Sequence, residues 1–323
     1  MTSSPQDGVR RSHLGVWHLG VWLVVLIGLA VALASALLVG SARSASHAQE
    51  GLIAFKRSDG IYIMRPDGSH VRPLKRARGS PVAHAMDLEW SPDGSRLAFA
   101  AEDTIWAMDA DGSDLVRFAL PEGATAAMSP TWSPEGREIA YTAYQEGDRD
   151  IWVVSADGSE QRRLVRTPDA WEAGVDWSPS GGKLAVVSDG WVPRLWIMNA
   201  DGTNRQRLTG RGSTGRVFEA FEPEWSPDGR RIAFAGDMGS GYDIYVIGLD
   251  GRPAVRLTTN FAVPDRSPTW SPDGRRIAFT RLSGLTDRSQ EIHVMNADGT
   301  EAKRLTKNKV AERSPAWQPG AAP

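Results

Sequence analysis

The sequence predicts an all-β fold, a six-bladed β-propeller with one blade closed by both chain ends, preceded by a single apolar N-terminal helix. Three observations predict it. A tryptophan motif recurs at nearly constant spacing, Gly (33) and Pro (20) are abundant among the 323 residues, and incomplete copies of the repeat stand at both ends of the repetitive region. Abundant turn residues indicate many short strands rather than a helical bundle.

The N-terminal part contains an apolar segment, residues 19–40, which runs 22 positions without a charge. About 20 apolar residues span the hydrocarbon core of a membrane, whereas the apolar region of a cleaved signal peptide is usually about 7–15 residues long. We therefore expect an uncleaved transmembrane signal anchor. Arg10 and Arg11 precede the span, which predicts that residues 1–18 are cytoplasmic.

Cleavage of this leader is the alternative, because the small-residue sequence Ser46 to Ala48 could serve as a cleavage site. Residues 41–50 are expected to be a linker between the apolar segment and the repetitive region. Under either alternative the rest of the chain is exported, to the periplasmic or cell-surface side of the cytoplasmic membrane.

The repeat begins with the motif Trp-Ser-Pro-x-Gly, whose tryptophans are spaced by 42 to 48 residues. They are Trp90, Trp132, Trp177, Trp225, Trp270 and, in a degenerate copy, Trp317. An apolar-Ala-apolar triplet follows each complete motif, as in residues 97–99, and then come an aromatic-bearing strand, an Asp-Gly turn and, in most copies, a short last strand. Four short strands in about 45 residues are typical of one propeller blade.

The residue types within the repeat fit this geometry. Pro in Ser-Pro-Asp-Gly fixes φ at the second turn position, and Gly supplies the positive φ that a tight hairpin needs. We expect each signature Trp to lie between two blades and to bury roughly 150–250 Å² there. The Ala of each triplet is expected where neighbouring blades approach most closely.

Closure of the ring is predicted from the incomplete repeat copies at the two ends of the repetitive region. The repetitive region begins with the triplet at residues 53–55, which lacks a Trp strand, and ends with a Trp strand at residues 314–319, which lacks a triplet. One blade is therefore built from both ends, which removes exposed sheet edges. The propeller is expected over residues 51–319, with residues 320–323 as a tail.

The sequence motifs of the repeat resemble those of TolB-type propellers, a WD-like family, over residues 51–319. These motifs are Trp-Ser-Pro-Asp-Gly, Ile-Ala-Phe and Asn-Ala-Asp-Gly-Thr. The resemblance implies an extracytoplasmic binding module of the cell envelope. It is confined to the propeller, because an N-terminal α/β domain precedes the propeller in TolB and an apolar segment stands there in this chain. Ser180 and Gln318 depart from the motif at single turn positions.

Composition excludes several function classes. A net charge of −2 gives no reason to expect a nucleic-acid partner, and the lack of cysteine excludes disulfides, thiolate zinc sites and a cysteine nucleophile. The Gly-x-Gly-x-x-Gly string at residues 210–215 follows the last strand of a blade rather than opening a helix, so it does not predict a dinucleotide site. His293 replaces the Trp or Tyr of other blades and is expected to be a packed ring. We expect no cofactor and no metal ion.

A docking surface is predicted on one face of the propeller. The Ser-Pro-Asp-Gly and Asp-Gly turns make one face uniform, here called the turn face, whereas the other connections vary and make the loop face. The predicted docking residues on the loop face are Trp171, Trp191, Phe218, Phe221, Arg266 and Arg313. The aromatic ones form either a docking surface for an envelope protein, peptide or glycan, or hydrophobic caps packed over the rim, and the two arginines are expected to make one side of the channel basic.

Acidic residues gather just before three of the signature tryptophans, on the innermost strands, and are expected to face the central channel. They are Asp87, Glu89, Asp176, Glu222 and Glu224. Hydrogen bonding to backbone is one role for them, and binding of a divalent cation is another. We therefore expect a monomeric, non-enzymatic binding or scaffold module. The alternative is a propeller enzyme of lactonase, cyclase or lyase type that uses these carboxylates with a divalent ion, and their convergence on one point would favour it.

Overall fold

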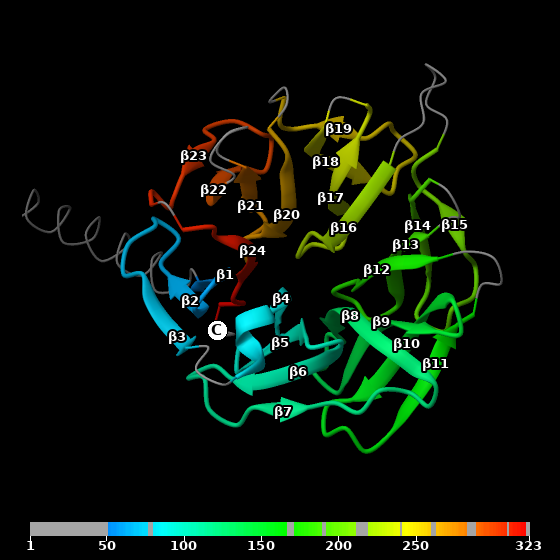
Figure 1. The fold of residues 1–323 in the computed structure, drawn as a ribbon. Coiled ribbons are helices and arrows are strands. Elements are labelled where there is room, and N and C mark those ends of the chain that lie inside the picture. The colour runs from blue at the N-terminus through cyan, green and yellow to red at the C-terminus, as the bar shows by residue number, and fades with distance from the viewer. Residues whose placement is uncertain are drawn as a thin grey trace, which may run out of the picture. The chain divides into compact units, whose positions relative to one another are not determined.

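Six four-stranded antiparallel sheets surround a central axis in the computed structural model, as Figure 1 shows. The structure describes residues 51–76, 80–166, 171–188, 192–210, 219–239, 241–259, 263–282, 289–308 and 310–320. The prediction of an all-β, six-bladed propeller is confirmed for this part of the chain.

Each blade runs from an innermost strand at the axis to an outermost strand at the rim. Blade 1 consists of β24 (Arg313–Trp317), β1 (Ile53–Arg57), β2 (Gly60–Met64) and β3 (Arg72–Arg76). Blade 2 consists of β4 (Met86–Trp90), β5 (Arg96–Ala101), β6 (Thr104–Asp109) and β7 (Val116–Arg117), with the short 3-10 helix η1 (Pro81–His84) before it. Blade 3 consists of β8 (Ala124–Trp132), β9 (Glu138–Gln145), β10 (Asp148–Ser155) and β11 (Gln161–Val165).

The remaining blades repeat this order. Blade 4 consists of β12 (Glu172–Trp177), β13 (Lys183–Ser188), β14 (Arg194–Asn199) and β15 (Gln206–Arg207). Blade 5 consists of β16 (Glu219–Trp225), β17 (Arg231–Asp237), β18 (Tyr242–Gly248) and β19 (Val255–Arg256). Blade 6 consists of β20 (Asp265–Trp270), β21 (Arg276–Leu282), β22 (Gln290–Asn296) and β23 (Lys303–Arg304).

The ring is closed by pairing of β24 with β1, the red and blue strands that lie side by side in Figure 1. Trp317 pairs with Ile53 in this antiparallel ladder. Just beyond it, the Gln318 backbone N–H donates to the Leu52 carbonyl at 2.7 Å, and the Gln318 side-chain amide donates to the Gly94 carbonyl of blade 2 at 2.8 Å. The departure from the motif at Gln318 therefore adds a side-chain link between two blades.

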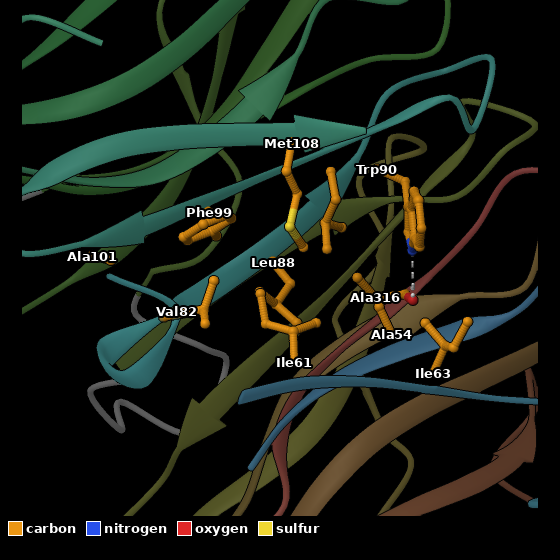
Figure 2. Packing of buried hydrophobic residues seen from close by; sticks show 12 residues of the cluster. Ala54, Ile61, Ile63, Val82, Leu88, Trp90, Phe99, Ala101, Met108 and Ala316 are labelled. Atoms are coloured by element: carbon orange, nitrogen blue, oxygen red, sulfur yellow. Dashed lines mark hydrogen bonds between the residues drawn. The ribbon is translucent and has the colours of Figure 1, made fainter. Parts of the chain in front are cut away.

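The hydrophobic core lies between adjacent blades. The six signature tryptophans are only 3–9% exposed, and the central Ala of each triplet is fully buried. Between blades 1 and 2, Ala54 and Trp90 belong to one apolar cluster, and the Trp90 indole N–H donates to the Ala316 carbonyl at 3.2 Å (Figure 2). A side chain larger than Ala at position 54 would hold the two sheets apart, since protein interiors are close-packed.

A β-bulge interrupts five of the innermost strands three residues before the signature Trp. The residues there adopt a left-handed backbone with φ of 50–53°, which is uncommon for residues other than Gly. They are Asp87, Ser129, Glu222, Ser267 and Ser314. The bulges bend the strands where they line the axis, so they set the shape of the channel.

None of the residues that the structure describes lies in a helix long and apolar enough to cross a membrane. The predicted span at residues 19–40 and the segments on either side of it, residues 1–18 and 41–50, fall outside the described residues.

Candidate functional site: the axial channel and its loop-face mouth

Two cavities lie end to end along the axis of the propeller. One, of about 100 Å³, is lined by residues one to four positions before the signature tryptophans, on the loop-face side. The other, of about 430 Å³, is lined by the tryptophans and the Pro residues of the turn motif. Glu89, Asp176 and Glu224 line both cavities and are here called the waist carboxylates.

Two of the waist carboxylates join neighbouring blades. Asp176 accepts the Trp225 backbone N–H at 2.6 Å with one oxygen and the Thr131 hydroxyl at 2.9 Å with the other. Glu224 accepts the Trp270 backbone N–H at 2.7 Å. These hydrogen bonds link the innermost strands of neighbouring blades, so the two acids have a structural role in the ring.

The waist carboxylates bind protons more tightly than free carboxylic acids. Burial raises the pKa of Asp176 to about 7, against the lowering effect of its hydrogen bonds. Burial also raises the pKa of Glu89 and of Glu224 well above the usual range, and the negative charge of Asp176 adds to both shifts. The charge of the waist therefore changes with pH around neutrality.

A second pair of acids lies nearer the loop face. Asp87 accepts the Ser129 backbone N–H at 3.1 Å, and Glu222 accepts the Ser267 backbone N–H at 2.7 Å. Burial raises the pKa of both carboxyls. Both acids thus accept the backbone N–H of a bulge residue in the next blade, whereas Glu89 has no hydrogen-bond partner within the described part of the chain.

The channel acids do not converge as a metal site would require. Within the described ranges, no group of three or more His, Asp or Glu side chains lies close enough to hold a metal ion. A calcium site needs six to eight oxygen ligands at about 2.3–2.6 Å. The convergence that would favour a metal-dependent propeller enzyme is therefore not met by Asp87, Glu89, Asp176 and Glu224.

The channel mouth on the loop face combines apolar and basic side chains. The Arg266 guanidinium lies 3.8 Å from the ring centroid of Tyr242, and the edge of Tyr242 packs against Phe221 with centroids 5.7 Å apart. Phe221 is thus a half-buried packing residue of the mouth. Arg313 is exposed, and Met86, which the sequence analysis did not select, is 50% exposed.

Trp171 differs from the signature tryptophans in being 53% exposed. It lies just before β12, and the Arg149 guanidinium carbon lies 5.6 Å from its ring centroid. Trp191 and Phe218 fall outside the described residues. Of the predicted docking aromatics that the structure describes, Trp171 is therefore displayed and Phe221 is packed.

His293 is half-buried, and its ring packs against a neighbouring strand. Its ring lies 5.6 Å from that of Phe279, and burial lowers its pKa to about 4. A base with this pKa is almost wholly neutral at pH 7. The nearby residues Arg281 and Asp265 form a bidentate ion pair with each other at 2.7 Å. The role of the His293 ring is therefore structural.

Comparison with known proteins agrees with the repeat and the fold. Residues 101–259 match the family model of the TolB beta propeller domain. Over these residues the chain resembles the TolB-like propeller family. The Tol-Pal system protein TolB of Anaeromyxobacter dehalogenans is 31% identical over 154 residues, which cover 46% of this chain and 35% of that protein. This TolB-like chain thus matches about a third of the length of that relative.

Solved structures show that the TolB-like chain shares the propeller fold. TolB from Acinetobacter baumannii superposes with a TM-score of 0.68 over 83% of this chain and 67% of that chain, at 21% identity. A putative TolB from Agrobacterium tumefaciens superposes with a TM-score of 0.63 over 80% of this chain and 88% of that chain, at 22% identity.

Proposed function

We propose that this TolB-like propeller is a non-enzymatic binding module outside the cytoplasmic membrane, which docks a protein of the cell envelope through its loop face. The observation that carries the proposal is the display of Trp171 on that face, 53% exposed in a protein whose six signature tryptophans are at most 9% exposed. Exposed tryptophan is enriched at the centres of protein interfaces.

The turn face supports the proposal by contrast, because its polar groups are used within the turns. Asp201 accepts the Thr203 backbone N–H at 2.9 Å and the Thr203 hydroxyl at 2.6 Å. Asp93 accepts the Ser95 backbone N–H at 3.0 Å in the same way. Side chains that complete their own turn have less hydrogen-bonding capacity for a partner.

The similarity to a Tol-Pal system protein supports a protein partner rather than a glycan. The channel mouth contributes Met86, Arg266 and Arg313 around an opening lined with acids. We propose that the propeller acts as a monomer, held at the membrane by residues 19–40 or released by cleavage.

Site-specific photocrosslinking in the native host tests the proposal. A photoreactive amino acid is placed at Met86 or Tyr144 on the loop face, and at Ser113 or Arg275 on the turn face, all of which are exposed. We expect one discrete adduct with an envelope protein from the loop-face positions and none from the turn-face positions. Adducts from the turn face alone, or the same background at all four positions, would contradict docking through the loop face.

A further inference from the structure

Three side chains form a row across the junction of blades 3 and 4 on the loop face. Tyr144 and Arg149 are direct partners in the β9–β10 hairpin, so their side chains lie on the same side of that sheet. Arg149 in turn lies against Trp171, which precedes β12 of the next blade. Tyr144 is 37% exposed and Trp171 is 53% exposed, so both rings of the row are open to solvent.

Side-chain hydrogen bonds link the residues beside this row to neighbouring segments. The Gln145 side-chain amide donates to the Glu122 carbonyl at 2.5 Å, which fastens the hairpin to the segment before β8. On the other side, Trp171 is followed by the buried carboxylate of Glu172, which accepts the Ser188 hydroxyl at 3.0 Å. These hydrogen bonds restrict the residues beside Tyr144 and Trp171, which lowers the entropic cost of binding there.

The guanidinium of Arg149 has no carboxylate partner among the described residues, although two aspartates flank it in sequence. Asp148 accepts the backbone N–H of Arg149 itself at 2.9 Å, and Asp150 is paired with Arg163 at 3.2 Å. The Nε–H of Arg149 is buried and meets no acceptor within hydrogen-bond distance. Because this Nε–H is buried, a ligand carboxylate would meet the terminal Nη groups of the half-buried Arg149, and an arginine without an anion favours such a ligand.

We infer that Tyr144, Arg149 and Trp171 form a hot spot for a protein partner that presents an acidic side chain flanked by apolar ones. The carboxylate pairs with Arg149 while the apolar neighbours pack on the two rings. Trp, Tyr and Arg are the three residue types most enriched at such hot spots. The inference rests on the proposed docking function and names the chemistry of the partner at one place on the loop face.

A pair of short peptides tests the charge requirement without a known partner. The probes are acetyl-Leu-Glu-Leu-amide and acetyl-Leu-Gln-Leu-amide, titrated into the ¹⁵N-labelled protein while the indole N–H resonance of Trp171, assigned with W171F, is followed by NMR. We expect the Glu peptide to shift this resonance with an affinity about tenfold higher than the Gln peptide, the difference typical of a charge-assisted pair. Arg149→Gln should abolish the difference, whereas Arg149→Lys should keep part of it.

The matched control is Arg252→Gln, which removes an exposed arginine on the turn between β18 and β19 and should leave both titrations unchanged. Equal shifts with both peptides, no shift with either, or an undiminished preference in Arg149→Gln would overturn the hot spot. Photocrosslinking from Met86 separates the two proposals. If the adduct persists while the peptides fail, only the hot spot is wrong, and if loop-face adducts are absent, the docking function itself fails.

Discussion

The carboxylate of Asp176 in blade 4 accepts the backbone N–H of Trp225 in blade 5 at 2.6 Å. A channel acid thereby holds the signature tryptophan of the next blade in place, and Glu224 does the same for Trp270. These bonds give the channel acids a structural role that does not depend on any ligand. Burial acts against these bonds and raises the pKa of Asp176 to about 7, so the stability of the ring is expected to depend on pH.

The free energy of unfolding of Asp176→Asn, relative to that of the wild type, is expected to be higher at high pH than at low pH. Folded Asp176 keeps its proton up to about pH 7, whereas the unfolded chain releases it near its ordinary value of 3.8. The unfolded state therefore binds fewer protons between these values, and the free energy of unfolding falls as pH rises through this window. Asn still accepts the Trp225 N–H with its oxygen and donates to the Thr131 hydroxyl oxygen, so it removes the titration while keeping both contacts.

Urea denaturation at pH 5 and pH 8 measures this effect. Relative to the wild type, Asp176→Asn should gain on the order of 2 kcal/mol on going from pH 5 to pH 8. Asp201→Asn is the control, because hydrogen bonds from Thr203 lower the pKa of this exposed carboxyl and its effect should be the same at both pH values. An equal effect of Asp176→Asn at both pH values would contradict the role given to burial.

The fold was predictable from the sequence because each blade repeats the same local chemistry. The Trp that fills the blade interface and the Gly that the turn requires recur together in each motif. The last motif, at Trp317, has no triplet after it, and this predicted the blade built from both chain ends. The channel position of Asp176 was also predictable, because it directly precedes a signature Trp on an innermost strand. Its bond to Trp225 was not, since it depends on how the innermost strands of two blades, 49 residues apart in sequence, lie side by side.

The loop-face surface was predictable only in part. Trp171 stood out because no repeat position accounts for it, and the structure shows it exposed. Arg149 gave no such signal, because a lone arginine in a hairpin is ordinary. Its place beside Tyr144 follows from the register of β9 and β10, and its contact with Trp171 follows from packing between two blades.

Lys56→Met is expected to stabilise the protein at neutral pH. Lys56 on β1 is only 1% exposed, and burial, followed by the nearby charge of Arg313, lowers its pKa to about 8. The equivalent positions of the other blades carry Ala100, Thr142, Val187, Ala235 and Thr280. Met keeps the apolar stem without the ammonium, so the free energy of unfolding should rise by about 1–3 kcal/mol at pH 7.

This gain should shrink as the pH rises from 8 to 10.5. In that window the unfolded chain holds the Lys56 proton and the folded chain does not, so the wild type itself becomes more stable with pH. Urea denaturation at pH 7 and pH 10 measures both values. Exposed Lys183→Met is the control and should change little at either pH. A gain that does not depend on pH would show that the lysine charge is not its cause.

Removing residues 314–323 is expected to open the ring. The truncation deletes most of β24, including buried Trp317, and leaves β1 as an unpaired edge. Losing a buried tryptophan alone costs about 3–5 kcal/mol, so the melting temperature should fall by about 10 °C or more. Removing residues 321–323 instead should leave the melting temperature unchanged. Equal melting of the two truncated proteins in a calorimetric scan would contradict closure by β24.

His293→Tyr is expected to protect the propeller from acid. Burial lowers the pKa of His293 to about 4. Between pH 6.5 and 4 this histidine therefore binds a proton in the unfolded chain but not in the folded chain. The free energy of unfolding therefore falls as pH drops through this window. Tyr62 and Tyr245 occupy the equivalent position in blades 1 and 5, so the ring should fit. Thermal melts at pH 7.5 and pH 5 should show a smaller acid loss in His293→Tyr, whereas exposed His70→Gln should behave like the wild type.

Trp171→Ala and Trp225→Ala should separate docking from folding. Trp225 is 5% exposed and lies between blades, so its loss should lower the free energy of unfolding by about 3–5 kcal/mol. Trp171 is on the surface, so its loss should change that free energy by no more than about 0.5 kcal/mol. The photocrosslinked adduct formed from Met86 should nevertheless drop severalfold in Trp171→Ala, because the exposed ring supplies contact area to the partner. Denaturation in urea and adduct yield are measured on the same preparations. A strongly destabilised Trp171→Ala would mean that the ring is a packed cap, and an undiminished adduct would mean that the partner binds elsewhere.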